Sequence, residues 1–405
     1  MKKTNSRVPY FICTIASGLQ LGALFTWSYY RESLTELFPS WTAGQLSLVF
    51  SMQNITVVIL ALVSGVLLKY LKPRALVAMG AAGVLIGLGA FPLFPTDNPG
   101  AAYIMLFICF GIFAASASGF SGIAIPAAYQ PWFPDHLGLL TGVLFLFSGI
   151  SPIILGYICS LLIPTVGVLR AVQILGFIGC FLLAVTLPWC KMPGPDVKLP
   201  PPKTIENAAS AHDYSWKDVL RSPLFWCFFL YNIMARSVGM VLLDLGGTIA
   251  GAFGAATLLG LMTSPANGAA SVAGGFIQDR IGTSKTILIS CGLLVLGSLL
   301  LITGNVSGSA YLVITALVAG GAGFGFSLVI GAAATRILFG NKYFAQNYGI
   351  ITLSLAPAAA FGYLAGRLLD RFGNYSGVFI LIMVLSVLSL VCGLVLARLK
   401  GASKK

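Results

Sequence analysis

The chain has 405 residues, of which 58% are hydrophobic and only 9% are charged, and its formal net charge is +13. A soluble domain usually has about 25% charged residues, so this composition excludes a soluble globular protein of this size. Apolar runs of about 18 residues or more, each long enough to cross a hydrocarbon core as a helix, recur along nearly the whole chain. The composition therefore predicts a multi-pass membrane protein.

Twelve such runs predict an all-α membrane protein with twelve transmembrane helices. The predicted spans are residues 9–30, 45–68, 75–95, 101–128, 137–163, 168–190, 223–245, 251–278, 285–304, 309–337, 344–368 and 375–398. The one long polar stretch separates the first six spans from the last six. We therefore expect an N-terminal six-helix bundle (1–190), a cytoplasmic linker (191–222) and a C-terminal six-helix bundle (223–405).

The N-terminal segment and the linker each contain a short sequence pattern that predicts local structure. The start, MKKTNSRVPYFICTIASGLQLGA, resembles a signal peptide, but its apolar run continues through Phe25 and Trp27, so we expect the first span to be retained. In the linker, LPPP (199–202) favours an extended segment. The sequence SWKD (215–218) fits a capping box that begins a helix leading into the seventh span.

Positive charge is divided unevenly between the two sides of the predicted membrane. If the N-terminus is cytoplasmic, 19 of the 24 lysines and arginines are cytoplasmic, which predicts cytoplasmic termini and a location in the cytoplasmic (inner) membrane. The other five are Arg31, Arg170, Arg367 and Arg371 on the outer side and Arg236 within a span. Because the basic residues are scattered over loops, nucleic acid is not an expected partner. The eight cysteines show no C-x-x-C pair and indicate buried apolar positions rather than a disulfide or metal framework.

The two halves contain matching segments. WFPDHLGLLTGVLFLFSGISPIILGYI (132–158) and LFGNKYFAQNYGIITLSLAPAAAFGYL (338–364) both begin with a polar loop and enter a helix with Ser, Pro and Gly at corresponding places. SGVLLKYLKPRALV (64–77) and GGFIQDRIGTSKTI (274–287) both link the second and third helices of a half. Parallel repeats of this kind indicate a transporter with its substrate site near the midplane.

The loop GGFIQDRIGTSK (274–285) resembles the G-x-x-x-D-R-x-G-x-x-[KR] motif of the major facilitator superfamily. The first-half copy is degenerate, with Lys69 at the position of the acid. FTWSYYRESL, YQPWFPDHLGLLTG, FGNKYFAQNYG and DVLRSPLFW are similar to segments of the oxalate–formate antiporter and monocarboxylate transporter branch. The resemblance covers nearly the whole chain and implies the twelve-helix major facilitator fold.

The same resemblance implies a conformational gate on the cytoplasmic side. Asp279 and Arg280 would pair with neighbouring helix ends, Gly275 and Gly282 would permit close backbone approach, and Lys285 completes the motif. The alternative is a solvated loop whose charges serve only to set the orientation of the chain in the membrane.

The oxalate–formate branch also implies where substrate charges would be met. It places an arginine in the eighth span and a lysine in the eleventh, and the corresponding residues here are Ser271 and Leu355. Without these two cations, oxalate is not the expected substrate. Phe324 in the tenth span and Trp27 and Tyr30 in the first would leave a more apolar cavity.

Arg236 lies inside the seventh span, where a charged side chain is costly and must find an acceptor. Asp244 follows eight residues later, about 12 Å along a helix at 1.5 Å per residue, and Gln53, Asn54 and Asn267 are other candidate partners. One interpretation is that Arg236 binds a substrate carboxylate, to which a guanidinium is well suited. The other is an interhelical salt bridge or hydrogen bond. Asp244 is a proton-coupling candidate or an interfacial charge, and the polar amides either line the site or hold helices together.

Enzymatic function is not expected, because the sequence contains no H-E-x-x-H, G-x-S-x-G or Walker A motif, and no cofactor is expected. The prediction is a monomeric secondary transporter for a small or medium organic anion, above all a monocarboxylate. It would work by proton symport or anion exchange with alternating access, its other partners being protons or a counter-anion and the lipid bilayer. The alternative function is a transporter-like sensor or a lipid or drug flippase with a neutral or amphipathic substrate.

Overall fold

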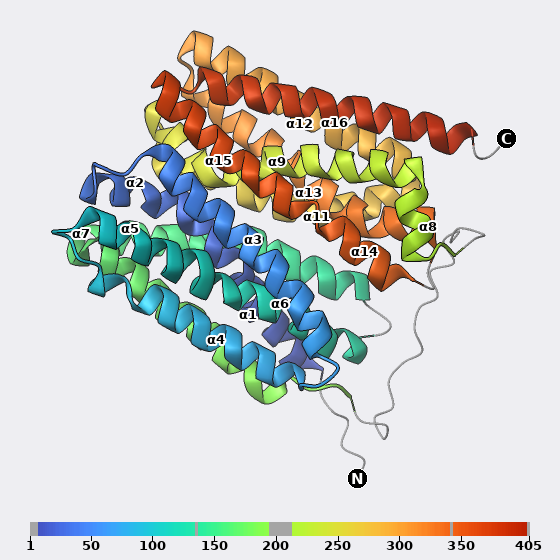
Figure 1. Ribbon diagram of the computed structural model, residues 1–405, viewed down its shortest axis with the longest axis horizontal. Helices are drawn as coiled ribbons and strands as arrows, with labels where there is room; N and C mark the ends of the chain where they lie inside the picture. The colour runs from blue at the N-terminus through green and yellow to red at the C-terminus, as the bar shows by residue number, and fades with distance from the viewer. Residues whose placement is uncertain (1–6, 134–136, 194–212, 341–342, 403–405) are drawn as a thin grey trace. The chain divides into compact units, whose positions relative to one another are not determined.

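The computed structural model describes residues 7–133, 137–193, 213–340 and 343–402, and every regular element in these ranges is a helix (Figure 1). The all-α class expected from the sequence is therefore confirmed. Contacts divide the chain into two compact units. Unit 1 comprises Met1–Thr26, Ser33–Ser40 and Met52–Ile205, and unit 2 comprises Trp27–Glu32, Trp41–Ser51 and Glu206–Lys405. The domain boundaries expected at 190 and 223 stay a prediction.

Unit 1 contains the helices of the first half of the chain, and α2 and α3 each also contribute residues to unit 2. These helices are α1 (Val8–Gly22), η1 (Ala23–Thr26), α2 (Trp27–Leu37), α3 (Ala43–Leu67), α4 (Pro73–Gly89), η2 (Phe91–Leu93), α5 (Pro99–Ile108), the π-helix η3 (Cys109–Ala114), α6 (Ala115–Tyr129), η4 (Gln130–Trp132), α7 (Leu137–Thr186) and η5 (Leu187–Trp189). Tyr10 of α1 stacks on Trp132 with ring centroids 4.0 Å apart. The Trp132 indole donates to the Lys191 carbonyl at 2.8 Å, which ties the ends of three helices together.

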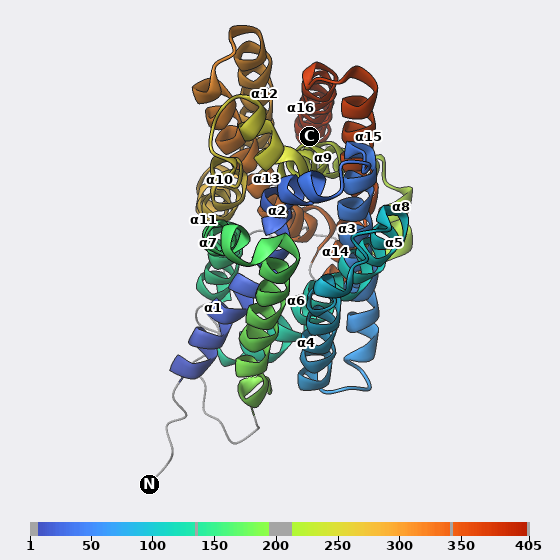
Figure 2. The same cartoon turned by 90° about the vertical axis from the view of Figure 1, so that its left-hand side faces the viewer.

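Unit 2 contains the helices of the second half. They are α8 (Trp216–Arg221), α9 (Pro223–Ala252), α10 (Thr257–Gly260), α11 (Thr263–Ile281), α12 (Thr283–Ser307), α13 (Ala310–Phe339), α14 (Phe344–Thr352), α15 (Leu355–Phe372) and α16 (Ser376–Ala402). Figures 1 and 2 show α15 and α16 side by side. The capping box expected at SWKD is present: Ser215 and Asp218 satisfy each other's backbone N–H groups at the start of α8.

Ten helices of the described chain are long and apolar enough to cross a membrane. The difference from twelve has two sources. The fifth and sixth predicted spans are merged in α7, which changes direction at Gly167 (φ 79°, ψ 163°). The eighth predicted span, α11, is not among the ten, because Thr, Ser, Asn, Gln and two charged residues replace large apolar ones in it. The exact number of twelve stays a prediction.

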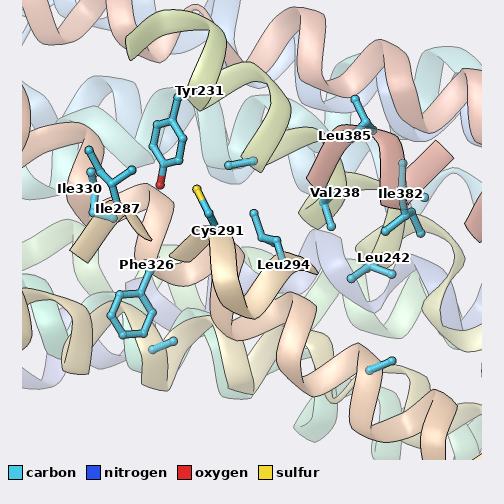
Figure 3. Packing of buried hydrophobic residues seen from close by; sticks show 14 of the residues in the cluster. Tyr231, Val238, Leu242, Ile287, Cys291, Leu294, Phe326, Ile330, Ile382 and Leu385 are labelled. Atoms are coloured by element: carbon cyan, nitrogen blue, oxygen red, sulfur yellow. The ribbon is translucent and has the colours of Figure 1, made fainter. Parts of the chain in front are cut away.

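The core of unit 2 is built around α9. Tyr231, Val238 and Leu242 of α9 lie among side chains of neighbouring helices, including Cys291 and Leu294 of α12 (Figure 3). The packing is close because α13 presents small residues. A side chain at Gly321 or Gly325 would collide with the carbonyls of Thr263 and Asn267 in α11. This core fixes the position of the buried side chains of α9.

Candidate functional site

Two charged side chains of α9 are almost completely buried. Arg236 is 1% exposed and Asp244 is 0% exposed, although both lie in a helix that is otherwise apolar or uncharged. They are eight residues apart, so they occupy different levels of the helix. The structure gives each a different partner.

At the first level, the Arg236 guanidinium has one hydrogen-bond partner in the described chain. Its Nη1 donates to Ser354 Oγ at 2.9 Å. Its buried Nε has no partner, and neither a hydrogen bond from Nη2 nor an ion pair is present among the described residues. The Nε and Nη2 groups form the edge of a guanidinium that binds a carboxylate in a bidentate manner. Within the described residues, that edge therefore has no hydrogen-bond partner.

Gly331 of α13 and Asn232 of α9 lie beside this edge. A Cβ built at Gly331 would lie 2.7 Å from Arg236 Nη2 and 3.4 Å from Asn232 Oδ1, so the missing side chain makes room for the guanidinium. Asn232 Nδ2 donates to the Phe228 carbonyl at 2.8 Å, which fixes the orientation of the amide. Its buried Oδ1 is left without a hydrogen-bond partner in the described ranges. An unmatched donor edge and an unmatched acceptor thus lie next to each other.

Ser354 lies where the eleventh predicted span is interrupted between α14 and α15. Pro357 explains the interruption, because it has no N–H group to continue the helical ladder. Ala356 N instead donates to the carbonyl three residues earlier, at 3.1 Å. Ser354 Oγ also donates to a carbonyl of α14 at 2.6 Å. Arg236 is therefore attached to a discontinuous helix, a feature that often forms binding sites in transporters.

At the second level, Asp244 forms an ion pair with Arg31 of α2. Arg31 Nη1 lies 2.6 Å from Asp244 Oδ1, and both side chains are buried. The Trp27 indole donates to the same oxygen at 2.9 Å. Arg31 also donates to Ser47 Oγ at 3.2 Å and to the Ala43 carbonyl at 2.9 Å. All of these residues belong to unit 2. The charge of Asp244 is therefore neutralised by protein.

Further polar contacts surround this ion pair in unit 2. Thr257 donates to the Glu32 carboxylate at 2.5 Å. Asp370 of α15 accepts from two backbone N–H groups at the start of α3, at 2.8 Å each, which suits the positive end of a helix. Tyr375 lies in the loop that joins α15 to α16 and within electrostatic reach of Arg31 and Glu32. Burial raises the pKa of its phenol, which therefore stays neutral.

The predicted site residues Tyr30, Phe324 and Asn267 are all buried in unit 2. Tyr30 is buried and meets Trp27 edge to face, with centroids 5.6 Å apart. Phe324 lies against the backbone of α9 at Gly239, where a side chain would collide with its ring. Asn267 is buried, and its Oδ1 has no partner in the part of the chain that the structure describes. These residues and Arg236 all belong to unit 2.

Gln53 and Asn54 belong to unit 1. Asn54 Nδ2 donates to Gln53 Oε1 at 3.1 Å, and both side chains are buried. Arg236 instead bonds to Ser354, which the sequence analysis did not consider.

Three site residues, Arg31, Asn232 and Ser354, were not identified from the sequence. Arg31 was assigned to an outer segment as an ordinary loop charge, whereas it is the partner of Asp244. Its signal was present, because Arg31 follows Trp27 by four residues and shares a helix face with it. Asn232 precedes Arg236 by four residues and could have been recognised in the same way. Ser354 gave no local signal apart from the nearby proline.

The two positions at which the related branch has cations are uncharged and differ in environment. Ser271 is buried and donates to the carbonyls of Asn267 at 2.9 Å and Gly325 at 3.2 Å. Leu355 is the first residue of α15 and directly follows Ser354, the partner of Arg236. The guanidinium from α9 thus reaches the region of the eleventh span in which Leu355 stands at the position of the related branch's lysine.

The loop with the expected gate joins α11 to α12. Gly282 has φ 83° and ψ 163°, a conformation that favours glycine, and a Cβ there would meet nothing within 4 Å. A Cβ at Gly275 would meet only Val329 at 3.8 Å, an ordinary contact. Glycine is thus required at 282 for its backbone conformation rather than for close approach. Arg280 and Lys285 are exposed, and the side chain of Asp279 lies outside the described residues.

Metal binding finds no support in the described ranges, where no group of three His, Cys, Asp or Glu side chains could hold an ion. The eight cysteines are free thiols.

Comparison with known proteins gives consistent matches. The family model described as Major Facilitator Superfamily matches residues 10–356. An uncharacterized MFS-type transporter, YhjX of Escherichia coli strain K12, is 24% identical over 352 residues, which are 84% of this chain and 83% of that protein. The oxalate:formate antiporter of Oxalobacter formigenes is 25% identical over 298 residues, covering 72% of this chain and 67% of that protein.

Solved structures give the same fold. A crystal structure of the nucleoside transporter NupG in a mutant form superposes with a TM-score of 0.71 over 96% of this chain and 99% of that chain, at 14% identity. The crystal structure of NupG without that mutation gives 0.66 over 97% and 98%, at 15% identity. At this level of identity the likeness concerns the fold alone.

Proposed function

Because this chain belongs to the major facilitator superfamily and is a multi-pass membrane transporter, we propose that it is a secondary transporter of a small or medium organic monoanion, above all a monocarboxylate. One observation carries the proposal. Arg236 is buried, and its Nε–Nη2 edge has no partner among the described residues. An isolated charge at membrane depth costs at least a few kcal/mol, so such an arginine is retained for a purpose.

A carboxylate would bind the Nε–Nη2 edge of Arg236 more strongly than a neutral group would. Its two oxygens match the two donors of the unmatched edge, and charge-assisted hydrogen bonds are about twice as strong as neutral ones. Ser354 holds the opposite side of the guanidinium at Nη1, so the edge stays oriented. Asn232 Oδ1 is an acceptor beside that edge and would favour a substrate with a donor near its carboxylate.

The charge balance favours one carboxylate over two. Arg31, which is also buried in unit 2, is already paired with Asp244. Ser271 and Leu355 supply no charge where the related branch has cations. A dianion would therefore meet one guanidinium and leave its second charge without a partner, which is costly in a medium of low dielectric constant. The same reasoning disfavours oxalate, although an oxalate:formate antiporter is among the relatives.

Transport would proceed by alternating access, driven by proton symport or by anion exchange. Asp244 is the proposed proton acceptor for the symport case, because its buried Oδ2 has no partner in the described chain. Protonation there would weaken the ion pair with Arg31. In the exchange case, Asp244 has a structural role and the counter-anion uses Arg236. The proposed location is the inner membrane with both termini cytoplasmic, as the distribution of positive charge favours.

The test is a thermal-shift screen of the detergent-purified protein against monocarboxylates and dicarboxylates, with Arg236→Gln measured in parallel. A ligand that binds the native state stabilises it by about 1.4 kcal/mol at ten times its Kd. We expect a monocarboxylate to raise the melting temperature of the parent and not that of the variant.

Two matched variants sharpen this test. Arg236→Lys keeps the charge but loses the bidentate edge, so we expect a reduced response. Ser354→Ala removes the protein partner of Nη1 and keeps the edge, so a response should remain. An equal shift in Arg236→Gln would make the arginine structural. If no acid shifts the parent, the alternative function with a neutral or amphipathic ligand gains support.

A further inference from the structure

A short helix, α8, lies at the end of unit 2 where α9 begins, and Figure 1 shows it running across the direction of α9. Because α9 is long and apolar enough to span the membrane, a helix that crosses its first turn runs along the membrane surface. The side chains of α8 divide accordingly. Val219 is fully buried against unit 2, whereas Trp216, Lys217 and Arg221 are exposed.

Two large indoles are exposed at this corner. Trp216 of α8 is 45% exposed, and Trp226 in the first turns of α9 is 49% exposed. The Trp226 indole donates to the Leu220 carbonyl at 2.9 Å, so its polar edge is satisfied by protein and its apolar face is left for lipid. Tryptophan with one apolar and one satisfied or wet edge is enriched at the level of lipid headgroups.

Two cations accompany these indoles. Lys217 Nζ lies 5.5 Å from the centroid of the Trp216 ring. Arg221 follows four residues later, so both cations are on the same side of α8. Neither forms an ion pair with a carboxylate in the described part of the chain. The intervening acid, Asp218, accepts from the backbone N–H and hydroxyl of Ser215 at 3.2 and 2.6 Å, as the capping box requires.

The α8 segment is also attached to helices that lead to the candidate site. Tyr214 N donates to the Phe339 carbonyl at the end of α13, at 3.1 Å. Asn347 Nδ2 of α14 donates to the Tyr214 carbonyl at 3.0 Å. These two hydrogen bonds of Tyr214, which directly precedes the capping residue Ser215, hold α8 in one place relative to α13 and α14.

We propose that Lys217 and Arg221, together with the faces of Trp216 and Trp226, bind the headgroup of an anionic phospholipid. The two cations would contact the phosphate, and the indoles would lie at the level of the glycerol backbone. Charge complementarity selects this partner, because an anionic headgroup has a net negative charge, whereas the cation of a zwitterionic headgroup offsets the attraction of its phosphate to Lys217 and Arg221. An ordinary aromatic belt would show no such preference for anionic lipid.

The experiment uses the full chain, purified in a neutral detergent and stripped of lipid. Phosphatidylglycerol or phosphatidylcholine is added in mixed micelles, and the melting temperature is followed against lipid concentration. Phosphatidylglycerol should raise it saturably and phosphatidylcholine should not. A basic residue near an anionic surface is worth about 1 kcal/mol, or about fivefold in affinity. Lys217→Gln/Arg221→Gln should therefore need about 30-fold more phosphatidylglycerol for the same shift.

Three controls test whether the rise in melting temperature depends on the cations of α8 and on a lipid headgroup. Lys217→Arg keeps the charge and should behave like the parent. Arg371→Gln removes one exposed cation that lies 5.8 Å from the ring of exposed Phe372 elsewhere in unit 2, and it should leave the response unchanged. Inorganic phosphate at equal concentration should give no shift. An equal response to phosphatidylcholine or phosphate, an unchanged double variant, or an equal loss in Arg371→Gln would each overturn the proposal.

Discussion

Arg31 and Asp244 form a buried ion pair within unit 2, with Nη1 2.6 Å from Oδ1, although the two residues are 213 positions apart in the sequence. The Trp27 indole shares the same carboxylate oxygen. This pair gives Arg31 and Arg236, the arginines of unit 2 that are buried among the described side chains, different chemistry. Arg31 is neutralised by protein, while Arg236 has a serine hydroxyl as its partner in the described chain. The distinction makes Arg236 rather than Arg31 the candidate receptor for an anion.

The ion pair predicts strongly coupled effects of mutation on stability. Arg31→Met leaves the Asp244 carboxylate buried without its cation, and Asp244→Asn leaves the Arg31 guanidinium without its anion. Breaking one side of a buried pair costs about 3–5 kcal/mol, whereas replacing both partners leaves no unpaired buried charge. Each single variant should therefore lower the melting temperature of the purified protein clearly, and Arg31→Met/Asp244→Asn should recover most of the loss.

The same double variant distinguishes a role of Asp244 in proton coupling from a purely structural role of the ion pair. If Asp244 accepts the transported proton, the double variant should be stable and still bind a monocarboxylate, but it should no longer concentrate it against a gradient in proteoliposomes. Anion exchange would be retained if the pair is structural. A double variant that loses as much stability as the two single variants together would contradict the ion pair itself, because the effects of independent sites add and those of coupled sites do not.

The helices were predictable from the sequence because lipid imposes a simple rule on them. Every backbone polar group must be satisfied within the membrane, so apolar runs become helices. Most predicted spans coincide with observed helices, but the eighth, predicted to begin at residue 251, is represented by α11, which begins at Thr263. The capping box at Ser215 and Asp218 was predictable for a similar reason, since its partners are three residues apart.

The partners of the buried charges were not predictable, because they lie far away in the sequence. Arg31 had the appearance of a loop charge near the end of a span, and its burial depends on α9 lying beside α2. Ser354 becomes the partner of Arg236 because Pro357 interrupts a helix in the eleventh predicted span. Composition and spacing identified Arg236 as unusual, and tertiary contacts decided what it bonds to.

Gly331 provides a test of the site that leaves Arg236 unchanged. In Gly331→Ala, the new methyl group would lie 2.7 Å from Arg236 Nη2, so the guanidinium must move and its Nε–Nη2 edge must leave its present position. We expect the response to monocarboxylates in a thermal-shift assay to fall at least tenfold in apparent affinity, with the ligand-free melting temperature changed by only a few degrees. The reason is that the side chain can rotate, whereas a two-point contact tolerates little displacement.

Gly292→Ala is the matched control for this variant. Gly292 lies in α12, and a Cβ there would meet nothing within 4 Å. Its substitution adds the same methyl group to a helix of the same unit, so monocarboxylate binding should be unchanged. Full retention of binding in Gly331→Ala would place the carboxylate site away from the Nε–Nη2 edge.

The loop between α11 and α12 allows backbone strain to be separated from gating. Gly282 has φ 83° and ψ 163°, a region that is almost restricted to glycine. Gly282→Ala should therefore cost about 1–3 kcal/mol. Gly167 in α7 has nearly the same conformation, with φ 79° and ψ 163°, and no neighbour within 4 Å of a Cβ. Gly167→Ala is thus a control with equal strain in unit 1.

If the loop is a gate, the two variants should lose similar stability but differ in transport. Gly282→Ala should slow substrate exchange in proteoliposomes at temperatures where the protein stays folded, because the strain reorients the segment that carries Arg280. Gly167→Ala should exchange at the parental rate. Gly275→Ala, whose methyl group meets only Val329 at 3.8 Å, should match the parent in both measurements. Parental exchange by Gly282→Ala would indicate a solvated loop without a gating role.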